Sequence, residues 1–147
     1  MSDPNVIIDA GAIVALLSQE DQFHSWASTV VSDLPIPFFT CESAVSETCF
    51  LLQRSRVPLD NLFALFARGS IRVVFTLDTE WAEISTLMAK YSKLPKGAMS
   101  LADACLVRLA ELNDRAAVLT TDKHFQIYRK HGRRQIPLIA PWIHANN

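Results

Sequence analysis

The stretch from Asn5 to Leu17 constrains the fold of this chain more than any other segment. Val6, Ile7 and Ile8 are consecutive and β-branched, which is typical of a strand buried on both faces in a parallel sheet. The run ends at Asp9, and the apolar segment 12–17 predicts a helix. Open α/β sheets hold their ligands beyond the carboxyl ends of the strands, where Asp9 would lie. A helix cap is the alternative role for Asp9, so its function depends on which other carboxylates reach the same edge.

The rest of the chain continues this alternation of strands and helices. Further strands are predicted over 37–40, 71–75, 116–119 and 136–139, and helices over 21–32, 42–54, 59–67, 79–91 and 100–112. The pattern predicts an α/β fold, a three-layer α/β/α sandwich with a mostly parallel sheet of about five strands. Pro137 lacks an N–H, which places the last strand at an edge of the sheet.

Several local features refine this prediction. Thr40 is expected to cap the helix at 42–54, and Gly69 to end the helix at 59–67. Ser100 and Asp103 have the spacing of a capping box before the helix at 100–112. The basic stretch 129–134 is expected to form a solvated turn.

Length and composition suit a single domain over residues 1–147. Half of the residues are hydrophobic, as expected of an ordered, soluble globule. The net charge of −1 provides no overall basic field, so binding of a nucleic acid would depend on a local patch. No apolar run is long enough to cross a membrane, and the segment 1–4 has no basic start of a signal peptide. A cytoplasmic location is therefore expected.

The cysteines and histidines do not predict a zinc or disulfide site. Cys41, Cys49 and Cys105 are odd in number and form no C-x-x-C pair, which favours reduced core residues. The four histidines lack ligand spacing and are interpreted as surface or boundary residues: His24, His124, His131 and His144.

Four acidic residues are the main candidates for a functional site. Asp9 and Asp122 end predicted strands, Glu47 lies beside the apolar stripe of one helix, and Asp103 opens another. Each also has an ordinary role as a helix cap or boundary residue. If all four converge, their mutual repulsion would be costly without a cation. A cluster of carboxylate oxygens suits Mg²⁺ or Mn²⁺ better than Zn²⁺.

The sequence resembles the PIN-domain ribonucleases, in particular the VapC-like toxins, over nearly its whole length. Four segments carry the resemblance: Val6–Asp9, Ser46–Glu47, Leu101–Ala104 and Leu119–Asp122. It implies that Asp9, Glu47, Asp103 and Asp122 form the catalytic metal site, with the Thr120 hydroxyl beside the last acid. Many relatives have Thr or Ser after the first Asp, whereas this chain has Ala10 followed by Gly11.

The resemblance also implies a function and partners. The expected activity is that of a Mg²⁺- or Mn²⁺-dependent endoribonuclease, in which metal-activated water hydrolyses RNA phosphodiester bonds. A toxin would pair with a cognate antitoxin and is expected to form a homodimer. Five basic residues are candidate phosphate contacts: Arg54, Arg56, Lys93, Lys96 and Lys123.

Two other functions compete with this interpretation. A phosphoaspartate hydrolase of the haloacid-dehalogenase type also has an Asp after its first strand, but it needs a second Asp where this chain has Gly11. A non-catalytic PIN module that binds RNA or a protein partner is the other alternative. The presence of all four acids speaks against it, and a nuclease assay with Mn²⁺ would separate the two.

Overall fold

The computed structural model describes residues 5–143, which form an α/β fold around a parallel sheet of five strands. The strand order is β3-β2-β1-β4-β7, and all four neighbouring pairs are parallel. The strands are β1 (Val6–Ile8), β2 (Phe38–Thr40), β3 (Ile71–Val73), β4 (Ala117–Leu119) and β7 (Leu138–Ile139). This confirms the predicted fold class, including the position of the Pro137 segment at a sheet edge.

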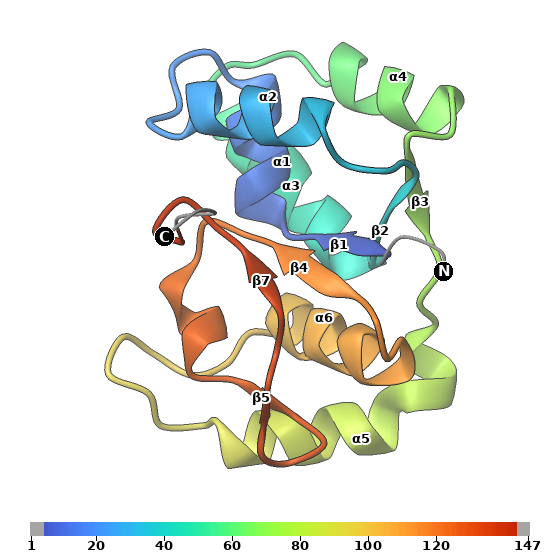
Figure 1. The fold of residues 1–147 in the computed structure, drawn as a ribbon, viewed down its shortest axis with the longest axis vertical. Helices are drawn as coiled ribbons and strands as arrows, with labels where there is room; N and C mark the ends of the chain where they lie inside the picture. Colours follow the sequence, from blue (N-terminus) through green and yellow to red (C-terminus); the bar gives the residue numbers. More distant parts are fainter. Residues whose placement is uncertain (1–4, 144–147) are drawn as a thin grey trace.

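Helices cover both faces of the sheet (Figure 1). They are α1 (Ala10–Leu17), α2 (His24–Ser32), α3 (Glu42–Arg54), α4 (Asp60–Ala67), α5 (Leu77–Lys90) and α6 (Leu101–Leu112). In Figure 1, α1, α2 and α4 lie on one side of the strands, and α5 and α6 lie on the other. Helix α3 packs against both α1 and α6, so it connects the two helical layers.

The central strand explains why the core has two halves. Val6 and Ile8 pack into one apolar cluster with α1 and α4, whereas Ile7 packs into the other with α5 and α6. Successive side chains of a strand point to opposite faces, so three consecutive β-branched residues supply both halves. The buried run Val6–Ile8, which predicted a parallel sheet, therefore contacts both helical layers.

The structure corrects two local predictions. Thr40 does not cap α3: its hydroxyl donates to the backbone oxygen of Ile8 at 2.9 Å, and Cys41 occupies the cap position without a side-chain bond. The basic stretch is a solvated turn only over 131–133: its two ends form an antiparallel hairpin of β5 (Arg129–Lys130) and β6 (Arg134–Gln135), in which Lys130 is buried. Gly69, by contrast, ends α4 as expected, with a φ of 75°.

Two tertiary contacts explain the hairpin. The Arg129 N–H donates to the Tyr91 hydroxyl at 3.0 Å, and the His131 N–H donates to Glu111 Oε2 at 2.7 Å. Partners on α5 and α6 thus fix the backbone of a segment whose own sequence is polar.

In the described part of the chain, no helix is both long enough and apolar enough to cross a membrane. The predictions that concern the segment 1–4 and His144 lie outside the described residues.

Candidate functional site

Asp9 and Thr120 meet at the carboxyl ends of two paired strands. The Asp9 N–H donates to the Leu119 backbone oxygen at 3.0 Å, which extends the β1–β4 pairing by one residue. The Thr120 hydroxyl donates to Asp9 Oδ2 at 2.7 Å and accepts from the Asp122 N–H at 2.9 Å. Asp9 occupies the cap position of α1 but makes no side-chain cap bond. A strand neighbour therefore gives Asp9 the hydroxyl partner that Ala10 does not provide.

Helix α1 passes close to the end of β4, and Gly11 makes this approach feasible. A Cβ atom at Gly11 would lie 2.6 Å from the Thr121 hydroxyl oxygen, which is closer than atoms normally approach. The glycine thus allows the first turn of α1 to lie against the segment that carries Thr120 and Asp122.

Asp103 lies in the first turn of α6 and faces the interior. Ser100 Oγ accepts from the Asp103 N–H at 3.0 Å, which confirms the predicted cap. The Asp103 carboxylate does not return to Ser100; it accepts from the Tyr128 hydroxyl at 2.8 Å. Tyr128 is completely buried, and its ring packs edge-on against Tyr91 and Phe125. The capping box therefore leaves the carboxylate available to the site.

Asp122 and His124 form the third part of the site. Asp122 caps the short 3₁₀ helix η1 (Lys123–Gln126) by accepting from the His124 N–H at 2.8 Å. Single ligand atoms of Asp103, Asp122 and His124 all lie within 4.8 Å of one another. His124 is half-buried, as a boundary residue would be, but its position beside two acids was not predicted. The spacing of histidines along the sequence gives no sign of this group, because its members come from separate segments of the chain.

Glu47 is the most exposed of the four acids. It lies on α3, outside the close group formed by Asp103, Asp122 and His124. Desolvation of the carboxylate and the charge of Asp122 raise the pKa of Glu47. The charge of Glu47 in turn raises the pKa values of Asp9 and Asp103. Asp9, Glu47 and Asp103 therefore each have a pKa raised by at least one other acid of the predicted set.

Burial and repulsion by neighbouring carboxylates make the ionised forms of Asp9 and Asp103 unfavourable. Burial and then the charge of Asp103 raise the pKa of Asp9 to about 8, although the Thr120 hydroxyl opposes the shift. Burial raises the pKa of Asp103 to about 6, with Tyr128 opposing and Asp122 adding to the shift. Within residues 5–143, no lysine or arginine forms an ion pair with any of the four acids. Like charges that lack a lysine or arginine partner fit a bound cation.

The predicted phosphate contacts are divided between two places. Lys96 and Lys123 line a hollow of about 620 Å³ together with Phe23, Asp122 and His124. Lys93 is exposed in the loop that carries Lys96.

Arg54 and Arg56 do not line this hollow. Arg54 lies seven residues after Glu47, about 10 Å further along the helix axis, and its guanidinium is 5.5 Å from the centre of the Phe50 ring. Arg56 follows the end of α3 and is exposed.

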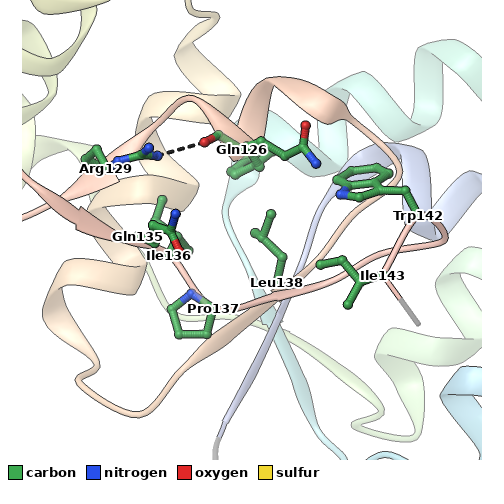
Figure 2. A pocket seen from close by; sticks show the side chains of 9 residues that line it. Gln126, Arg129, Gln135, Ile136, Pro137, Leu138, Trp142 and Ile143 are labelled. Carbon is green, nitrogen blue, oxygen red and sulfur yellow. Dashed lines mark hydrogen bonds between the residues drawn. The ribbon is translucent and has the colours of Figure 1, made fainter. Parts of the chain in front are cut away.

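A second hollow, of about 470 Å³, lies beside β7 (Figure 2). Its walls include Ile136, Leu138 and Trp142, and Arg129 at its rim donates to the Gln126 backbone oxygen at 2.7 Å. None of the four acids lines this hollow. It is therefore separate from the acidic site.

Comparison with known proteins identifies the family. The sequence matches the PIN domain over residues 6–130, which include all four acids. The chain belongs to the PIN-domain family. The structure of this PIN domain resembles that of VapC20 from Mycobacterium tuberculosis, described as a toxin that cleaves the sarcin–ricin loop. The TM-score is 0.62 at 20% identity, covering 78% of this chain and 87% of VapC20. No curated protein matches the chain significantly.

In this PIN domain, Tyr128→Phe should remove a hydrogen bond that becomes stronger when Asp103 is ionised. We expect it to lower the free energy of unfolding of the metal-free protein by about 1–3 kcal/mol at pH 8, and by less at pH 5. Urea melts of the two proteins in EDTA at both pH values measure the difference.

Tyr91→Phe is the matched control, because the Tyr91 hydroxyl accepts from a neutral backbone N–H. Its loss of stability should be similar at both pH values. If the two variants respond alike to pH, the Tyr128 hydroxyl does not sense the charge of Asp103.

Proposed function

We propose that this protein is a divalent-metal-dependent endoribonuclease that hydrolyses RNA phosphodiester bonds. The proposal rests on the electrostatic influence that Asp9, Glu47, Asp103 and Asp122 exert within their group at the carboxyl edge of a PIN-domain sheet, where no lysine or arginine of the described residues forms an ion pair with them. Parallel α/β sheets commonly hold ligands at this edge.

The donor chemistry of the site fits a hard divalent ion. Asp103 and Asp122 offer carboxylate oxygens within 4.8 Å of each other, and Asp9 and Glu47 add negative charge nearby. Carboxylate oxygens are the usual protein ligands of Mg²⁺ and Mn²⁺. We propose that the four acids hold one or two such ions. A bound ion would lower the pKa of water and offset the negative charge that develops on the phosphate.

The residues around the acids have positioning roles in this proposal. Thr120 holds the Asp9 carboxylate and the Asp122 backbone, and Tyr128 holds the Asp103 carboxylate. Lys96 and Lys123 lie at the same hollow as Asp122, where their charges would contact phosphates on either side of the cleaved bond. Lys93 is a further candidate in the same loop, whereas Arg54 and Arg56 would contact only a longer RNA.

We further propose that the nuclease acts in the cytoplasm as the toxin of a toxin–antitoxin pair and works as a homodimer. The fold similarity to VapC20, a toxin, supports the toxin role. Exposed apolar side chains, among them Trp81 and Leu77 one turn apart on α5, suit contact with an antitoxin or a second copy. Sedimentation of the purified protein, alone and after co-expression with the neighbouring reading frame, would test both partners.

The direct test of the proposal is metal-dependent cleavage. Purified protein incubated with single-stranded and with structured RNA should produce fragments in Mg²⁺ or Mn²⁺ and none in EDTA. Excess Mn²⁺ added after EDTA should restore cleavage, and DNA of the same sequence should remain intact. RNA that stays intact with both ions, although the protein binds it, would instead favour the non-catalytic PIN module.

A further inference from the structure

Asp122 positions the backbone of His124 and also lies next to its side chain. The His124 backbone N–H donates to Asp122 Oδ1, which fixes the start of η1 beside the acids. The ring nitrogen Nδ1 lies 3.4 Å from Asp122 Oδ1. The ring centre is 6.3 Å from that of Tyr128, whose hydroxyl binds Asp103. The His124 imidazole therefore lies close to both Asp122, which it neighbours directly, and Tyr128, which binds Asp103.

The His124 imidazole has no hydrogen-bond partner among the described residues. Within 5–143, neither of its ring nitrogens makes a hydrogen bond, and Asp122 is its only acidic neighbour within 4 Å. His24 differs in this respect, because its Nδ1 is 2.8 Å from the Ala15 backbone oxygen and so has a structural role. A half-buried imidazole whose ring nitrogens make no hydrogen bond, beside two carboxylates, is a mixed nitrogen and oxygen donor set.

The type of donor bears on which ion is bound. Mg²⁺ takes oxygen ligands almost exclusively, whereas first-row transition ions also accept imidazole nitrogen. We infer that His124 is a ligand of the ion held by Asp103 and Asp122, and that it makes the site prefer a transition ion such as Mn²⁺ to Mg²⁺. This inference rests on the proposed metal-dependent nuclease function and adds to it the choice of ion.

Electron paramagnetic resonance of the Mn²⁺-loaded protein tests the ligand directly. The wild type should show ¹⁴N modulation from a coordinated imidazole, and His124→Gln should lose it. His131→Asn is the matched control, because His131 lies in the β5–β6 turn with a φ of 52°, a conformation that Asn tolerates. This control should keep the nitrogen signal.

Ion preference gives a second measurement, independent of activity. The ratio of Mg²⁺ to Mn²⁺ dissociation constants, obtained from melting-temperature titrations, should fall about tenfold or more in His124→Gln. Gln offers a neutral oxygen in place of the nitrogen, so Mg²⁺ binding should change little. His131→Asn should leave the ratio unchanged.

The outcomes separate this inference from the proposed function. Bound Mn²⁺ without a nitrogen signal, or a His124→Gln variant with the wild-type ratio, would overturn the role of His124 and leave the nuclease proposal intact. If neither ion raises the melting temperature and no RNA is cleaved, both fail.

Discussion

Asp103→Asn should lower RNA cleavage in Mn²⁺ by about a hundredfold or more, because changes around a metal ligand commonly have effects of this size. Stability in EDTA should remain within about 1 kcal/mol of the wild type or rise. The substitution removes a charge from a crowded acidic site but keeps an oxygen that can accept from the Tyr128 hydroxyl. It also keeps the N–H that binds Ser100, so the start of α6 is preserved.

Asp103→Ala is the comparison that separates charge from packing. It leaves the buried Tyr128 hydroxyl without its acceptor, which should lower the free energy of unfolding by about 1–3 kcal/mol. Urea melts in EDTA and cleavage assays in Mn²⁺ should therefore show two inactive variants, of which only the alanine one is unstable. An asparagine variant that is destabilised yet cleaves RNA normally would reduce Asp103 to a structural residue of the helix.

The metal-free protein should lose stability as the pH rises from about 4 to about 9. The pKa values of Asp9 and Asp103 in the folded protein, about 8 and about 6, both lie above their ordinary value of 3.8. In this range the folded state binds more protons than the unfolded state, so each pH step favours unfolding. The stabilisation that comes from the protonated Asp9 and Asp103 carboxyls is complete below about pH 4. The part due to Asp103 is lost by about pH 6, and the part due to Asp9 by about pH 8. The total change should be several kcal/mol.

Asp9→Asn provides the control for this pH dependence. Asn is neutral throughout and still offers an oxygen to the Thr120 hydroxyl, so the decline should become shallower and end near pH 6 to 7. Mn²⁺ should also oppose the decline in the wild type, because a cation favours the ionised carboxylates. Urea melts between pH 4 and 9, with EDTA and with Mn²⁺, give the curves. Metal-free stability that rises over this range would contradict the assigned pKa shifts.

The sequence predicts the sheet, the position of Asp9 at a strand end and the start of α6 because their signals are local. The β-branched run 6–8 and the acid after it occupy adjacent positions, and the structure shows a buried strand that ends at Asp9. The Ser100–Asp103 spacing likewise indicates the start of α6. Such patterns depend only on neighbouring residues, so they can be interpreted before the fold is known.

The missed features depend on contacts between distant segments. The hairpin of β5 and β6 is held by Tyr91 and Glu111, which its own polar sequence does not reveal. Thr40 bonds Ile8 across the sheet, although its local sequence suggests a cap. His124 joins the acids only because η1 follows β4 and α6 begins nearby. Spacing along the chain carries no signal for such groupings.

The hydrogen bond between Thr120 and Asp9 has a consequence for the newly made chain. It joins residues 111 positions apart, so the strand that precedes Asp9 must await a segment that is synthesised much later. At ribosomal rates of about 5–20 residues per second, roughly 6 to 22 s separate the two ends of this bond. Throughout that interval Asp9 lacks its hydroxyl partner, and for most of it the chain lacks Asp103 as well. In the proposed nuclease, the acidic site therefore cannot form until the segment that carries Thr120 and Asp122 has been synthesised.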